Sequence, residues 1–244
     1  MTQLFGADTK LNDSIRVGIL LGMGKTNTKE DGSKEFENKN RHFGIYGDVD
    51  FDLARLKLGA IYTKADHNKV GLSTIVSHIS RDKIKSDETM VNLFANLVYS
   101  GFDTQNFSID PYLGISHIYV KTDGMSQRVG PFTMSTDDST RNMNIATIGI
   151  APSVPLKMGS MDTRVELDLA YNYFFGDKRP STGLNIADAG YVKLQGKAIK
   201  DLATVDFGLN MMLSKNASLK VFYGGAFGSD IKSNSLGAKF QILF

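Results

Sequence analysis

The last nine residues of the chain alternate between apolar side chains and mostly polar or small ones. From Leu236 to Phe244, every second residue is apolar, and Gly237, Lys239 and Gln241 stand between them. Successive side chains of a β-strand point to opposite faces, so this segment predicts a strand with one strongly apolar face. A chain that ends in such a strand is typical of a closed membrane β-barrel, where the last strand pairs with the first and leaves no edge in lipid.

The same alternation recurs along the rest of the chain. In the clearest segment, every second residue from Val165 to Phe175 is apolar or aromatic. Together with the terminal strand, ten further segments give eleven predicted strands: near 3–11, 15–25, 41–51, 55–64, 89–99, 107–120, 142–156, 163–175, 202–213 and 218–228. We therefore expect an all-β fold, an antiparallel up-and-down transmembrane β-barrel.

The connections between these segments alternate in length. Short ones lie near 12–14, 52–54, 100–106, 157–162 and 214–217, whereas long polar ones lie near 25–40, 64–88, 121–141 and 176–200. Short turns on one rim and long loops on the other are the pattern of outer-membrane barrels, with the short turns in the periplasm.

The number of predicted strands is odd, whereas bacterial single-chain barrels have an even number. We therefore expect about twelve strands in the complete domain, with the first strand upstream of the eleven visible here. The alternative is an uncounted strand in the loops 121–141 or 184–200. There, Tyr191 to Leu194 (YVKL) are compatible with one arm of a hairpin above the membrane.

Composition excludes several classes of function. The net charge is +2 with 28 basic and 26 acidic residues, so no nucleic-acid partner is expected. Cysteine is absent, which excludes a disulfide framework and a cysteine metal site. No stretch of about 18 apolar residues predicts a transmembrane helix. The first residues lack the pattern of a signal peptide, so we expect the C-terminal piece of a longer precursor.

The face opposite the apolar one carries charges of both signs. A soluble sandwich would bury apolar side chains on its inner face. Charge there instead predicts a wet or plugged lumen, and about twelve strands enclose more space than their own side chains fill. The residues expected to face the lumen are Arg16, Arg164, Glu166, Asp168, Asp206, Lys220 and Lys239.

Three short motifs occur in order along the second half of the chain. They are Asp110–Gly114 (DPYLG), Glu166–Asp177 (ELDLAYNYFFGD) and Gly196–Asp201 (GKAIKD). In order and spacing, about residues 107–244 resemble the β-domain of classical autotransporters, the type V secretion systems of Gram-negative bacteria. Tyr171 departs from the family's usual Trp, and Ala198 stands where Pro is common.

The resemblance implies a function and a set of partners. It implies a translocator in the bacterial outer membrane that exports an N-terminally fused passenger domain. The ending resembles the assembly signal of such barrels at Gly237, Phe240, Ile242 and Phe244. The implied partners are outer-membrane lipid, the barrel-assembly machinery and the passenger, and no cofactor, metal or catalytic residue is implied.

Two other readings stay open at this point. One is an outer-membrane porin or adhesin-like barrel without a passenger. The other is a barrel protease or lipase, for which Glu166 and Asp168 are a pair of carboxylates, although a lumenal charge ladder is the favoured interpretation. The segment Gly22–Thr26 looks like the end of a phosphate-binding loop but has no upstream Gly at position 19. The four histidines show no metal-ligand spacing.

Overall fold

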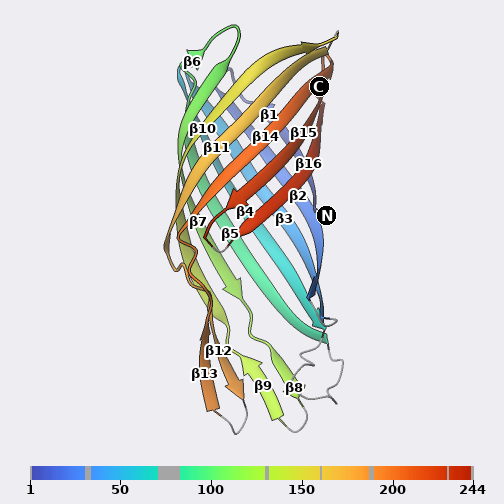
Figure 1. Cartoon of the computed structure of the whole chain (residues 1–244), viewed down its shortest axis with the longest axis vertical. Helices are drawn as coiled ribbons and strands as arrows, with labels where there is room; N and C mark the ends of the chain where they lie inside the picture. Colours follow the sequence, from blue (N-terminus) through green and yellow to red (C-terminus); the bar gives the residue numbers. More distant parts are fainter. Residues whose placement is uncertain are drawn as a thin grey trace.

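The computed structural model describes residues 2–30, 34–70, 83–129, 132–159, 161–186, 190–229 and 231–242. Its regular elements are all β-strands (Figure 1). Within these ranges no helix is long and apolar enough to cross a membrane.

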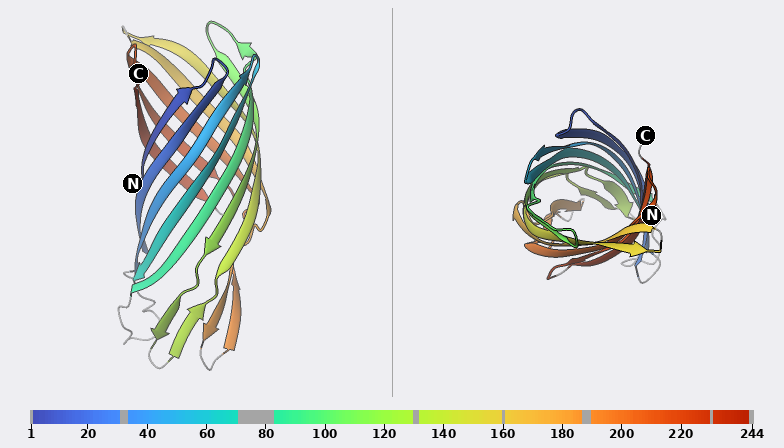
Figure 2. Two further views of the ribbon diagram at one scale, coloured as in Figure 1. Left: turned by 180° about the vertical axis from the view of Figure 1, so that it is seen from behind. Right: turned by 90° about the horizontal axis from the view of Figure 1, so that it is seen from above.

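Eleven long strands form one antiparallel sheet in chain order. Each strand within the path pairs with the strand before and the strand after it, and the first and the last strand pair on one side. The two-residue strand β6 (Phe102–Asp103) pairs beside the path with β7. Figure 2 shows that the sheet curls back on itself, so the predicted antiparallel up-and-down barrel fold is confirmed. The eleven strands are β1 (Thr2–Lys10), β2 (Ile15–Glu30), β3 (Lys34–Phe51), β4 (Ala54–Val70), β5 (Lys83–Tyr99), β7 (Ser108–Thr122), β10 (Ser139–Met158), β11 (Met161–Gly176), β14 (Asp201–Ser214), β15 (Ala217–Phe227) and β16 (Lys232–Ile242).

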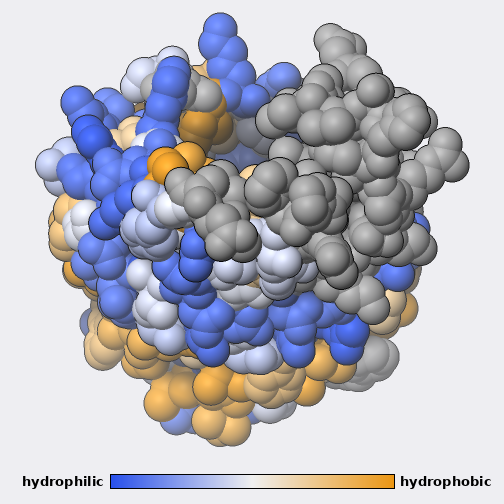
Figure 3. Space-filling model, turned by 90° about the horizontal axis from the view of Figure 1, so that it is seen from below, coloured by the Kyte–Doolittle hydropathy of each residue, from blue (hydrophilic) through white to orange (hydrophobic). Residues whose placement is uncertain are grey.

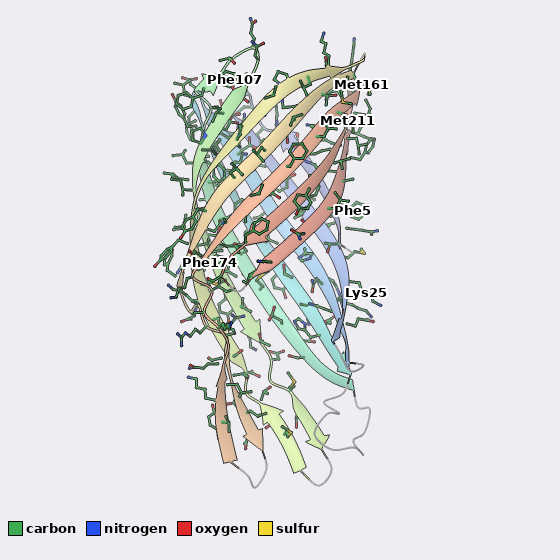
Figure 4. The ribbon with its side chains drawn as sticks, in the orientation of Figure 1. Phe5, Lys25, Phe107, Met161, Phe174 and Met211 are labelled. Carbon is green, nitrogen blue, oxygen red and sulfur yellow. The ribbon has the colours of Figure 1, made fainter. Side chains whose placement is uncertain are left out.

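The outer face of the sheet is apolar and exposed. Leu21, Phe43 and Tyr62 are cross-strand neighbours on β2, β3 and β4, and their exposed fractions are 52%, 50% and 44%. Phe5 on β1 is 62% exposed and projects from the edge of the sheet (Figure 4). Among the described residues, no large side chain is fully buried. A continuous apolar surface of this kind requires lipid in place of water.

The connections 123–138 and 177–200 both lie at the end of the barrel strands opposite the tight turns. Antiparallel neighbours are joined at one end by tight turns such as 52–53 and 215–216. The predicted long loops 25–40 and 64–88 were wrong in extent, because β2 continues to Glu30 and β4 to Val70. The alternation of apolar residues stops earlier, but the backbone ladder continues between polar residues.

Cross-strand ion pairs accompany these polar extensions. Lys25 on β2 lies 2.9 Å from the Glu37 carboxylate on β3, and Lys64 on β4 lies 3.5 Å from Asp87 on β5. Opposite charges on neighbouring strands stabilise pairing without apolar burial. A prediction that relies on alternating apolar residues therefore ends these strands too early, at the edge of the apolar band.

A second sheet is built from the two longest described connections. It contains β8 (Ser126–Val129), β9 (Phe132–Thr136), β12 (Ser181–Ile186) and β13 (Gly190–Gln195), in the order β13-β12-β9-β8. It extends beyond the long-loop end of the barrel strands (Figure 1). The expected hairpin arm at 191–194 is thus part of β13, and it adds no strand to the barrel sheet.

The first and last strands, β1 and β16, form the two edges of the large sheet. No pairing joins them within the described ranges. Ten antiparallel pairings separate the edges of this eleven-strand path, so β1 and β16 run in the same direction. A strand placed between them would be antiparallel to both.

Candidate functional site: the inner wall of the barrel

The seven residues expected to face the lumen all lie on the face opposite the apolar one. They come from five strands, β2, β11, β14, β15 and β16. Their neighbours in the chain, such as Val17, Leu167 and Phe207, belong to the apolar side. Viewed from the long-loop end in Figure 3, hydrophilic residues predominate, whereas hydrophobic residues lie along the outer flank.

Charged side chains of this wall contact or face polar and charged groups on other strands. The ammonium group of Lys220 on β15 forms an ion pair with Glu166, two strands away on β11. The guanidinium of Arg164 donates a 3.1 Å hydrogen bond to the hydroxyl of Ser153 on β10. Asp168 lies directly opposite Asp206 in the β11–β14 register. The structure therefore brings six of the predicted charges, from Arg164 to Lys239, onto four adjacent strands, with Lys239 directly opposite Lys220, and leaves Arg16 apart from them on β2.

Tyrosines complete the wall, and sequence reasoning missed them. The hydroxyl of Tyr112 on β7 donates a 2.7 Å hydrogen bond to Asp168, across the intervening strand β10. On the other side of the barrel, Tyr46 donates to Asp8 at 3.0 Å, and Arg16 lies 3.7 Å from the same carboxylate. The available signal was the alternation itself, because both tyrosines occupy positions on the polar face.

Glycines on neighbouring strands leave the space that these tyrosine rings occupy. A Cβ added at Gly149 would lie 2.3 Å from the Tyr112 ring, and one at Gly18 would lie 2.4 Å from the Tyr46 ring. Such distances are far inside van der Waals contact, so only glycine leaves room. The rings lie against the wall instead of standing upright in the lumen.

Gly237 has the same structural role. A Cβ there would lie 2.4 Å from the Phe222 ring on β15. Phe240 and Ile242, on the opposite face of β16, are 59% and 49% exposed. Phe244 lies outside the described residues. Of the three described residues of the expected assembly signal, Gly237 thus makes room for a ring on the inner face. Phe240 and Ile242 belong to the apolar row on the outer face.

In the described parts of the chain, the remaining candidate motifs form neither a phosphate-binding loop nor a metal site. Gly22–Thr26 lies within β2, paired with β3 throughout, so it forms no phosphate-cradling loop. His42 and His117 each contact one neutral side chain, Thr63 at 2.9 Å and Asn144 at 2.8 Å. His67, expected in a loop, lies in β4, and His78 is outside the described residues. No group of three potential metal ligands occurs among the residues described.

Two known proteins match almost the whole chain at low identity. Two proteins from Serratia marcescens, each called "Extracellular serine protease", are 23% and 22% identical over 96% of this chain. The match covers 23% of the length of each relative.

Solved structures share the fold. The translocator domain of the autotransporter NalP from Neisseria meningitidis superposes with a TM-score of 0.76 at 13% identity, covering 100% of this chain and 79% of that one. The β domain of the Bordetella autotransporter BrkA gives 0.72 at 14% identity, covering 100% and 90%. A family model described as "Autotransporter beta-domain" matches residues 2–224. The chain therefore belongs to the autotransporter β-domain family of outer-membrane barrels.

Proposed function

We propose that this chain is the outer-membrane translocator through which an N-terminally fused passenger domain reaches the cell surface. The observation that carries the proposal is the curled sheet with an apolar outer face and a charged, hydrogen-bonded inner wall. Family membership supports it over a porin without a passenger. The protease named in the Serratia relatives belongs to those proteins, and we assign no catalysis to the present barrel.

The inner wall suits the passage of an extended chain of mixed sequence. The seven predicted lumenal residues comprise four cations and three carboxylates, a sum of +1. Lys220 is paired with Glu166, and Tyr112 donates to Asp168. A wall whose charges of both signs nearly balance in sum hydrates a passing chain without strongly favouring acidic or basic segments.

We further infer a twelfth strand that lies between β1 and β16 and is supplied from upstream of residue 1. An antiparallel strand there would join two edges that otherwise run in the same direction. An open edge in lipid leaves backbone groups without partners, which costs several kcal/mol for each group. Extending the chain upstream should therefore raise its resistance to unfolding in detergent. No gain on extension would contradict this closure.

The end of the chain is proposed to act as the assembly signal. Phe240 and Ile242 project from the apolar side of β16, whose far edge pairs with no described strand. An exposed edge strand is recognised by β-augmentation, in which backbone pairing gives affinity and alternate side chains give specificity. The barrel-assembly machinery is the partner proposed for this edge.

Surface display of an epitope-tagged passenger tests the function. Gly149→Trp places a large ring on the inner wall, whereas Ala146→Trp places the same ring on the outer face of the same strand. With display counted per inserted barrel, we expect a marked loss for Gly149→Trp and little change for Ala146→Trp. Equal display in both variants would argue against passage along this wall.

A further inference from the structure

One part of the inner wall carries no charge, although the lumen as a whole is polar. Two adjacent cross-strand rows of inward residues run from β2 through β3, β4, β5 and β7 to β10. Every position of these two rows belongs to the described part of the chain, and none has a charged side chain. We call this surface the neutral wall. It includes Leu20, Ile61 and Ile118 in one row and Tyr46, Phe94 and Ile145 in the other.

Glycines keep the surface of the neutral wall shallow. A Cβ added at Gly59 on β4 would lie 2.4 Å from the Phe94 ring, so this ring lies against the wall, as the Tyr46 ring does. Gly44 separates Leu20 from Ile61, and a Cβ there would lie 3.4 Å from Leu20 and 3.3 Å from Ile61. The neutral wall therefore offers the lumen ring faces and methyl groups, and its glycines leave space beside them.

The charged part of the inner wall lies on the other side of the lumen. Six charged side chains lie on β11, β14, β15 and β16: Arg164, Glu166, Asp168, Asp206, Lys220 and Lys239. In the view along the barrel, β2 to β4 lie across the opening from β11 and β14 (Figure 2). On the neutral side, charges begin one row nearer the short-turn rim, where Arg16, Asp48 and Lys57 are successive cross-strand partners. Beyond that row, the lumen has one neutral side and one charged side.

We propose that this lumen favours extended passenger segments in which apolar and polar side chains alternate. Successive side chains of an extended chain point to opposite sides, so such a segment can place its apolar side on the neutral wall and its polar side toward the charged wall. Contact with the neutral wall removes apolar surface from water, and the polar side chains stay hydrated. The inference rests on the proposed translocator function and names the kind of chain that the lumen favours.

The test compares two epitope-tagged passenger segments of the same length and composition. In one segment valine and serine alternate, and in the other two valines are followed by two serines throughout. Both are fused upstream of the complete barrel, and export is followed as the time course of tag exposure on intact cells. In the wild-type barrel we expect the alternating segment to be exported several-fold faster than the paired one, because only alternation gives the chain one apolar side.

Barrel variants connect this preference to the neutral wall. Leu20→Asn and, separately, Ile61→Asn should bring the ratio of the two export rates close to one. Leu202→Asn is the matched control, because Leu202 also faces the lumen but lies on β14, on the charged side, opposite Asn172. It should leave the ratio unchanged. The ratio is independent of how much barrel is inserted, and heat-modifiable gel migration confirms that each variant is folded. Ile61→Asn carries the test if Leu20→Asn does not fold.

Cross-linking of an arrested alternating segment shows which side faces which wall. A cysteine at a valine position should cross-link to Ile61→Cys, and one at a serine position to Asp206→Cys. Equal export of the two segments by the wild-type barrel would overturn the inference and leave the translocator function intact, as would an equal change of the ratio in Leu20→Asn and Leu202→Asn. Export of neither segment would count against the translocator function itself, and the inference would fall with it.

Discussion

Phe207→Arg and Asp206→Arg place the same charge at adjacent positions of β14 but on opposite faces of the sheet. Phe207 is 48% exposed on the apolar face, between Leu167 and Tyr223 on the neighbouring strands. An arginine at mid-bilayer costs about 2–4 kcal/mol, less toward the interfaces. At about 1.4 kcal/mol for each factor of ten, the folding equilibrium constant should fall by about 30- to 700-fold.

Asp206 faces the inner wall, opposite Asp168. An arginine there meets water and a carboxylate of opposite charge, so its cost should be a small fraction of that at position 207. The assay is denaturant unfolding of each variant folded into lipid vesicles, with the two midpoints compared at equal slope. Equal destabilisation at the two positions would refute the assignment of faces.

Three further predictions follow from the contacts described above. Gly149→Ala should destabilise the barrel by about 1–3 kcal/mol, because its Cβ meets the Tyr112 ring. In a double-mutant cycle, Tyr112→Ala should relieve most of that cost. Additive costs would show that the two residues do not interact. Since the chain contains no cysteine, Lys193→Cys on β13 should react with an impermeant maleimide on intact cells, whereas Asn216→Cys in the β14–β15 turn should not; the reverse pattern would invert the topology. Phe240→Ser, and likewise deletion of Phe244, should lower barrel insertion and passenger display together in a membrane-fraction assay, and full display in both variants would reduce this ending to a lipid-facing strand.

The faces of the strands could be predicted from sequence because successive side chains of a strand point to opposite faces, so the alternation in the sequence becomes an alternation of faces in the structure. Each outward apolar residue from Val165 to Tyr173 has its inward counterpart one position away, and the β11 register keeps both sets aligned with their neighbours. Local alternation is thus sufficient to assign the lipid side and the lumenal side of the barrel.

Contacts between strands could not be predicted in the same way. The pairing of Tyr112 with Asp168 joins residues 56 positions apart across an intermediate strand, and it depends on the register of two ladders. The close approach of the Tyr112 ring to Gly149 depends on the register between β7 and β10 in the same way. The polar ends of β2 and β4 were missed for another reason, since their pairing is stabilised by charges such as Lys64 and Asp87 and not by apolar alternation.

Cross-linking during export tests the central claim most directly. A passenger carrying one cysteine near its junction with the barrel is arrested in transit and treated with a short bismaleimide. A cysteine at position 206 should cross-link to it, and a cysteine at the adjacent position 205, on the lipid side of β14, should not. Cross-linking at 205 equal to or greater than that at 206 would contradict translocation along the inner wall of this barrel.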